Sequence, residues 1–318
     1  MFQVPRVART SVGQTLSVAV LAVALILVMA MPASATFVDD LNGALNFAVL
    51  GQVPSSGTPQ LNYNNGTITG DIGIGNPRTF TISNASLFGN IRFSGVSNTS
   101  GLTPDPDPGS NPGPFTVSGG GTVTGGVFAN DPTVTPAINA MNFTSAKYGG
   151  EAGTSLTITS GGSINASAGT LDASGNRVFT VTSNVNFPNG TFTINGSASD
   201  FVVININTGT NTNLHGQILL AGGITSDHVL INVVGTNALD VNTNGLSTFG
   251  IFLDALGTMS AVHTDIQGRF FGGDSSNIQI VSGANITSPP RVPEPATLFL
   301  LGVGLAGLGA LLRRQRRA

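Results

Sequence analysis

The sequence contains no cysteine and no tryptophan, and only 8% of its 318 residues are charged. Without cysteine, the chain has no disulfides, no thiolate metal sites and no thiol nucleophile. The histidines are scattered with no close metal-ligand spacing, so surface or turn positions suit them better than a metal site: His215, His228 and His263. We therefore expect neither a metal nor a cofactor.

Patterns typical of catalysis are also missing. Serine is abundant, yet no Gly-x-Ser-x-Gly motif is followed by the Asp and His of a hydrolase triad. An enzyme that cleaves carbohydrate needs paired carboxylates, or carboxylates beside a basic residue. The candidates that lie close enough in the sequence are Asp254, Asp265, Arg269 and Asp274. Isolated loop charges that keep strands soluble are the better interpretation, so we expect no enzyme and keep a carbohydrate-active β-helix as the least favoured alternative.

The central part of the chain is acidic. Between Thr36 and Pro290 there are five basic residues and fourteen acidic ones, which gives a net charge of 5 − 14 = −9. This balance argues against nucleic acid or anionic lipid as a partner of this part.

What the chain has instead is glycine, threonine, serine and asparagine between β-branched residues. Short strand patterns recur about every ten residues, many of them Thr-apolar-Thr or Asn-apolar-Asn, with Gly and Asn at the turns. This predicts an all-β extracellular domain over residues 36–290. Because no exact repeat is present, an identical-unit solenoid is excluded. An irregular right-handed β-helix remains open on this pattern, and a β-sandwich is the runner-up.

Three segments interrupt the strand pattern. Residues 39–50 have helical spacing of apolar residues, and we expect a short helix that caps one end of the β core. Residues 131–148 form a second helix candidate, with Pro136 near the start. Residues 97–115 carry five prolines, which forbid a strand ladder and predict an exposed loop.

The N-terminus has the three parts of a secretory signal. Arg6 and Arg9 precede an apolar stretch over residues 18–31, and small residues follow at Ala33 and Ala35. This order predicts a signal peptide over residues 1–35, with signal peptidase cutting next to Ala33 and Ala35.

The C-terminus has three parts as well, over residues 291–318. Val292, Pro293, Glu294 and Pro295 precede an uncharged run over residues 296–312. As a helix this run is about 25 Å long, just enough for a hydrocarbon core of about 30 Å. Four arginines follow and would stay in the cytoplasm as a membrane stop: Arg313, Arg314, Arg316 and Arg317. A plain single-span membrane anchor is the simplest interpretation.

The order of proline-glutamate-proline motif, apolar helix and arginine cluster resembles the PEP-CTERM sorting signal of exported bacterial proteins. The resemblance implies recognition by a membrane-embedded exosortase, cleavage at or near the motif, and transfer to the cell surface or the extracellular matrix. In that case Pro293, Glu294 and Pro295 are contacted by the processing enzyme and perform no chemistry themselves.

The central domain has a resemblance of its own. Phe47-Ala48-Val49-Leu50-Gly51 and residues 67–75 look like the opening of bacterial β-helical surface proteins, which include ice-binding, adhesion-like and "choice-of-anchor" ectodomains. Residues 214–221 and 250–271 are similar to the later coils of that group. The resemblance implies a β-helix and favours it over the sandwich. The chain departs from the ice-binding pattern because it lacks a long run of regularly spaced threonine.

Together these observations predict an exported, non-catalytic structural or adhesion protein. It is first held in the membrane by its C-terminal helix, and after processing it lies at the cell surface or outside the cell. Extracellular polysaccharide is a candidate partner of its polar strands. A glycan- or ice-binding module is the alternative, which a flat strand face of aligned threonine would favour.

Overall fold

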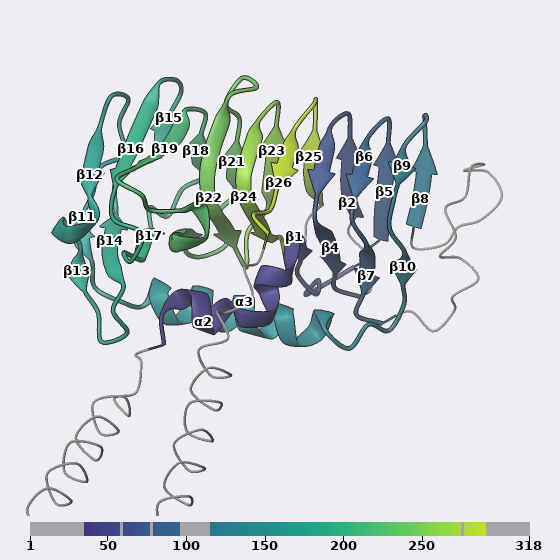
Figure 1. Cartoon of the computed structure of the whole chain (residues 1–318), viewed down its shortest axis with the longest axis horizontal. Helices are drawn as coiled ribbons and strands as arrows, with labels where there is room; N and C mark the ends of the chain where they lie inside the picture. The colour runs from purple at the N-terminus through teal and green to yellow at the C-terminus, as the bar shows by residue number, and fades with distance from the viewer. Residues whose placement is uncertain (1–34, 58–59, 77–78, 96–114, 275–276, 291–318) are drawn as a thin grey trace, which may run out of the picture. The chain divides into compact units, whose positions relative to one another are not determined.

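The computed structural model describes residues 35–57, 60–76, 79–95, 115–274 and 277–290 (Figure 1). The chain divides into two units, Met1–Ala35 and Thr36–Ala318, and every element below belongs to the second. The predicted signal sequence, nearly all of the proline-rich loop and the sorting segment lie outside the described residues. Within these ranges, none of the helices combines the length and the apolar character needed to cross a bilayer.

The second unit is a β-helix in which short strands form parallel sheets along the stack. Sheet A runs in the order β10 (Val127–Phe128), β7 (Ile91–Phe93), β4 (Asp71–Ile74), β1 (Phe47–Gly51), β24 (Asp265–Gly272), β22 (Ser247–Asp254), β20 (Val229–Val233), β17 (Val202–Ile206), β14 (Arg177–Val181) and β11 (Thr154–Ser155). Sheet B runs in the order β15 (Asn186–Phe187), β18 (Thr212–Leu214), β21 (Leu239–Val241), β23 (Met259–Val262), β25 (Ile278–Val281), β2 (Gln60–Asn64), β5 (Thr79–Ser83) and β8 (Phe115–Ser118).

A third side closes the coil and is made of two groups of strands. One group is β12 (Ser163–Asn165), β16 (Thr191–Asn195) and β19 (Gln217–Ala221), and the other, joined to β24, is β26 (Asn285–Thr287), β3 (Thr67–Thr69), β6 (Ser86–Phe88) and β9 (Thr122–Val123). The pairs within both groups are parallel. β13 (Thr170–Leu171) pairs with β14 in the antiparallel direction. The expected β-helix is thus confirmed over the sandwich.

The coils are not stacked in chain order. From β1 the chain winds through β4 and β7 to β10, and α3 (Val134–Gly149) then runs back along the stack (Figure 1). The chain winds again from β11 to β24, which pairs with β1 so that Val49 lies beside Phe270. The first and last coils therefore meet in the middle of the stack.

The helices lie on the outer face of sheet A. Phe37 of α2 (Phe37–Leu41) and Met141 of α3 belong to one buried cluster with Val203 of β17 and Leu230 of β20. These strands are consequently buried on both faces, as their nearly continuous apolar sequences require. Fully burying one such side chain contributes about 1.5–3 kcal/mol.

The expected helix over residues 39–50 is only partly present. The α-helix ends at Leu41, the 3-10 helix η1 continues over Asn42–Asn46, and Phe47–Gly51 is strand β1. Strand pairing with both β24 and β4 outweighs the helical spacing there. The helix also packs along sheet A, so the prediction that it caps one end of the β core was wrong. The second expected helix is confirmed, as α3.

A column of glycines allows the coils to turn tightly between the third side and sheet A. A Cβ atom on Gly268 would lie 1.9 Å from the carbonyl oxygen of Gly250 in the next coil. Likewise, a Cβ on Gly89 would lie 2.2 Å from the oxygen of Gly70, and one on Gly125 would lie 2.3 Å from that of Gly89. Backbone atoms occupy the space that a side chain would need, so glycine is required at this corner.

Candidate functional site

The outer face of sheet B is the broad open face of the β-helix. Among the strands, α3 packs against β17, β20 and β22, which all belong to sheet A. Figure 1 shows α2 and α3 along the bottom of the stack and the strands of sheet B above them. Residues alternate along these strands: Leu61 and Tyr63 of β2 are buried, whereas Gln60 and Asn62 are half-buried and face outward.

The outward residues of neighbouring strands lie in register. The central row crosses sheet B from β18 to β8 and consists of Asn213, Asp240, Ser260, Gln279, Asn62, Thr81 and Thr116. A second row follows two residues further along the strands and includes Val262, Val281, Asn64, Ser83 and Ser118. With strand spacings of about 4.8 Å, eight strands make a face about 34 Å long.

This face carries little net charge. The carboxylate of Asp240 is paired with His215, whose Nε2 lies 2.8 Å from Oδ2. The amide of Gln60 donates to the hydroxyl of Thr81 in the next strand. Threonine has a stiff χ1 angle, so hydroxyls such as those of Thr81 and Thr116 are held in fixed positions. The arrangement offers ordered hydrogen-bonding groups.

The polar groups on sheet A serve a different purpose, because they fasten α3 to the strands. The buried Asn232 donates to Asn205 Oδ1 at 3.0 Å and to the carbonyl of Ser145 at 3.1 Å. Asn205 in turn donates to the carbonyl of Tyr148 at 2.6 Å. These asparagines tie β17 and β20 to α3 through carbonyls near the end of the helix.

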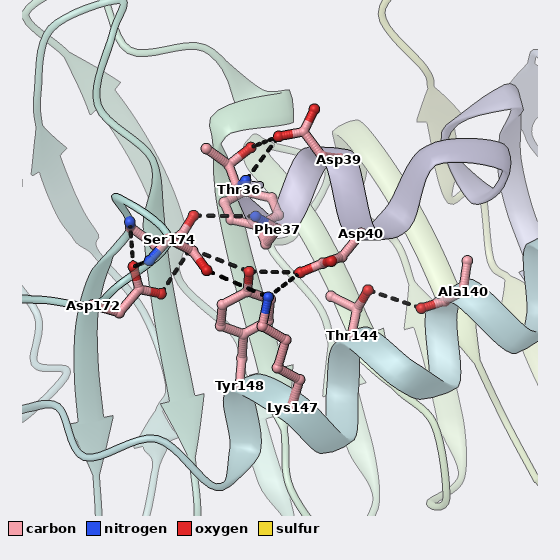
Figure 2. A network of polar contacts seen from close by, with 11 residues as sticks. Thr36, Phe37, Asp39, Asp40, Ala140, Thr144, Lys147, Tyr148, Asp172 and Ser174 are labelled. Atoms are coloured by element: carbon pink, nitrogen blue, oxygen red, sulfur yellow. Dashed lines mark hydrogen bonds and ion pairs between the residues drawn. The ribbon is translucent and has the colours of Figure 1, made fainter. Parts of the chain in front are cut away.

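A second polar network joins α2, α3 and the segment before β14 (Figure 2). Asp40 accepts hydrogen bonds from Lys147 Nζ at 2.6 Å and from the hydroxyl of Tyr148 at 2.7 Å. Asn176 donates to Asp172 at 2.7 Å and to Tyr148 at 3.2 Å. Burial, together with the charge of Asp40, raises the pKa of Tyr148. The hydroxyl therefore stays protonated as a donor.

Glu151 lies beside this network in an open groove next to the end of α3. Burial and the neighbouring Asp172 raise the pKa of Glu151 to about 7. The groove has a volume of about 440 Å³ and is lined by glycines, hydroxyls and amides. Among the residues that line the groove, Glu151 carries the one carboxyl group, whereas a glycosidase requires a pair of carboxyl groups.

The four residues considered as catalytic groups of a carbohydrate-cleaving enzyme do not lie together in one site. Asp254 is buried and accepts from the backbone of Gly257, whereas Asp265 accepts from Ser247 and Gln267 on the third side. Arg269 is paired with Asp227, and Asp274 accepts from the backbone of Ser55, 219 residues away in the chain.

The histidines are also apart from one another. His215 lies on sheet B beside Asp240, His228 stacks on Phe201 with ring centroids 4.3 Å apart, and His263 lies in a turn with φ of 45°. In the part of the chain that the structure describes, no group of three or more His, Asp or Glu residues is arranged to hold a metal ion.

Sequence reasoning missed the register of sheet B. The Thr-apolar-Thr and Asn-apolar-Asn strands already indicated one exposed face each. Asn62 and Gln279 are neighbours in the central row although 217 residues separate them, and nothing local in the sequence signals that pairing.

Comparisons with known proteins agree with this architecture. The fold is similar to that of an ice-binding protein from the Antarctic ascomycete Antarctomyces psychrotrophicus, with a TM-score of 0.50 and 19% identity over 79% of this chain and 98% of that chain. It is also similar to an ice-binding protein from an Antarctic bacterium of the Flavobacteriaceae, with a TM-score of 0.52 and 14% identity over 80% of this chain. The match covers 48% of that second protein, about half its length.

The tail is identified independently of the fold. Residues 291–317 match the PEP-CTERM protein-sorting motif, which confirms the resemblance of the tail. The motif implies export, membrane-associated sorting and processing by an exosortase. No curated protein sequence matches the chain. The protein is thus an exported protein with a PEP-CTERM tail and a β-helical domain whose fold resembles that of ice-binding proteins.

Proposed function

We propose that the exported domain is a non-catalytic, ice-binding surface protein and that the outer face of sheet B is its binding face. The observation that carries this proposal is the in-register row of polar side chains across sheet B, in which Asp240 is the one carboxylate and is paired with His215. A flat surface with fixed, evenly spaced hydroxyls and amides matches a flat, periodic surface of ordered water. The sequence alone argued against ice binding because its threonines are not regularly spaced. In the folded protein, however, serine and asparagine occupy the equivalent positions of the face.

Location is the second part of the proposal. The PEP-CTERM tail first places the domain at the membrane, and processing then leaves it at the cell surface or in the extracellular matrix. Among the described residues, the helices pack on sheet A and not on sheet B, which favours sheet B as the face that makes contacts outside the cell.

Adhesion to extracellular polysaccharide is the second candidate. Amide side chains such as those of Gln60, Gln279 and Asn213 interrupt the threonine and serine positions of the face. Amides both donate and accept hydrogen bonds, which suits sugar hydroxyls. The hydrogen-bonded side chains of Asp240 and His215 on the same face would also bind hydroxyl groups.

Replacing Thr81 with lysine tests the binding face. The new ammonium group would have to lose its water when the face meets ice, and burying an unpaired charge is costly. We expect the thermal hysteresis of the Thr81→Lys variant to fall about tenfold or more, which corresponds to about 1.4 kcal/mol. The thermal hysteresis of the variant and of the parent protein is measured as freezing-point depression at equal protein concentrations.

Thr193→Lys is the matched control. Thr193 is also half-buried and outward on a strand, but it lies in β16 on the third side. This variant should keep the hysteresis of the parent protein. Equal losses in both variants would contradict the assignment of the face. Loss of binding to insoluble polysaccharide in Thr81→Lys alone, in a parent protein without hysteresis, would support adhesion instead.

A further inference from the structure

The described chain is fixed to the fold almost to its last residue. Strand β26 pairs with β24 on one side and with β3 on the other. Directly after it, both the backbone nitrogen and the hydroxyl of Ser288 lie 3.1 Å from the carbonyl oxygen of Thr69, to which they donate. Fraying of this end therefore requires the loss of several hydrogen bonds.

Arg269 holds the next residue. Its side chain is 1% exposed, and its NH2 group donates to the carbonyl oxygen of Pro289 at 3.3 Å. The same guanidinium contacts Asp227 at 3.1 Å and the carbonyl of Phe47 at 3.3 Å. A buried arginine depends on its partners to offset the loss of water. Pulling Pro289 away removes one of these partners, so the chain is held at this point.

The N-terminal end of the domain lies near the same place. The ring of Phe37, next to the expected start of the mature chain, packs edge-on against Phe201 at 6.2 Å. Phe201 stacks on His228 at 4.3 Å, and the adjacent Asp227 is the partner of Arg269. A short series of contacts thus links the two ends of the domain.

The sorting motif follows Pro289 after very few residues. The match to the motif begins at residue 291, and Pro293 is four residues beyond Pro289. Four residues span at most about 14 Å when fully extended. The apolar run begins at Ala296, at most about 25 Å of chain from Pro289, and lipid headgroups take up roughly 6 Å of that distance. An enzyme in the membrane that binds the motif must therefore meet the folded domain.

We propose that Arg269 and Pro289 form a clamp that limits access of the membrane-embedded processing enzyme to the sorting motif. Release of the processed protein then depends on the number of residues between Pro289 and Pro293. The clamp rests on processing of the PEP-CTERM tail, and it is independent of ice binding by sheet B.

Adding residues between Pro290 and the sorting motif tests the clamp without disturbing the fold. Six Gly/Ser residues are inserted after Pro290 of the full-length protein, in a bacterial host that processes PEP-CTERM tails. Pulse-chase labelling follows its transfer from the membrane fraction to the released fraction. We expect release to become about tenfold faster, because six residues add up to about 20 Å of chain between the clamp and the motif; a tenfold change corresponds to about 1.4 kcal/mol in the barrier. Unchanged release after this insertion would overturn the proposal.

A matched insertion and two further variants separate the alternatives. The same six residues after Gly209, an exposed turn glycine with no atom near its Cβ position, should leave the release rate unchanged, and equal acceleration there would overturn the clamp. The double variant Arg269→Gln/Asp227→Asn should also accelerate release. Its effect should not add to that of the insertion after Pro290, because both changes act on access of the processing enzyme to the motif. Additive effects would contradict the clamp.

Deleting Pro293 to Pro295 tests the premise separately. This variant should remain in the membrane fraction. Normal release of the deletion variant would show that the tail is not processed through its motif, and the clamp would fail together with that premise. If the deletion blocks release and the insertion after Pro290 has no effect, processing stands and the clamp alone is refuted.

Discussion

Replacing Gly268 with alanine is expected to lower the free energy of unfolding by about 4 kcal/mol or more, a loss seen with severe core defects. The added Cβ atom would lie 1.9 Å from the carbonyl oxygen of Gly250. The clash is with backbone, so no side chain can rotate to relieve it, and the two coils must move apart. Urea denaturation, followed by far-UV circular dichroism, measures the change.

Gly150→Ala is the control for this prediction. The nearest atoms to a Cβ at Gly150 are carbonyl oxygens at 3.7 Å, an ordinary contact distance. Gly150 also has φ of −86°, which any residue adopts. We expect this variant to keep the stability of the parent protein. A Gly268→Ala variant as stable as Gly150→Ala would mean that adjacent coils are not in contact at the glycine corner.

A pH-dependent loss of stability is expected from Asp254. Its side chain is fully buried, its Oδ1 accepts from the backbone of Gly257 at 2.7 Å, and its Oδ2 has no hydrogen-bond partner among the described residues. Burial raises the pKa of Asp254 to about 7, against the opposing effect of backbone hydrogen bonds from Gly257 and Leu256. The folded protein thus keeps this proton at pH values where the unfolded chain has released it.

The direction of the effect follows from these two pKa values. Below about pH 4 both states are protonated, and the contribution of Asp254 to stability is fully present. Between pH 4 and 7 the unfolded chain ionises while the folded chain does not, so this stability is lost as the pH rises. A rise of about three pKa units corresponds to about 4 kcal/mol. Glu151 has a raised pKa of about 7 as well, so its contribution to stability is also lost as the pH rises.

Asp254→Asn should remove most of this dependence. We expect its free energy of unfolding to change less between pH 4 and pH 8 than that of the parent protein, by a few kcal/mol. Urea midpoints across this pH range provide the measurement. Asp265→Asn, which alters a carboxylate on the third side hydrogen-bonded to Ser247, should follow the parent curve. Parallel curves for the parent and Asp254→Asn would show that Asp254 is ionised in the folded state.

The sequence contained enough information for the type of fold but not for its winding order. Alternating strands such as Phe80-Thr81-Ile82 and the proline near the start of α3 are local signals, and both led to correct elements. The pairing of β1 with β24 joins segments more than 200 residues apart. Local periodicity carries no record of such contacts, and for the same reason residues 47–50 were assigned to a helix although they form a strand.

For the candidate site, too, the sequence predicted the local features but not the long-range contacts. The sequence shows that each strand of sheet B is exposed on one face, but it does not show which strands lie next to one another. Ser260, for example, lies between Asp240 and Gln279 in the central row. Conversely, Asp254 and Arg269 suggested a catalytic group by their closeness in sequence. On the paired strands β22 and β24, Arg269 lies beside Ile251, three residues before Asp254, so the alternation of side chains along a strand turns the two to opposite faces. They accordingly have different partners.

The absence of cysteine allows a direct test of sheet B as the ice-binding face. Ser260→Cys places one thiol in the central row, and Ser163→Cys places one on β12 of the third side. Each is measured for adsorption to growing ice before and after reaction with a bulky maleimide. We predict that the modification at position 260 abolishes adsorption and that the modification at position 163 does not. Undiminished adsorption after complete modification at position 260 would contradict the account.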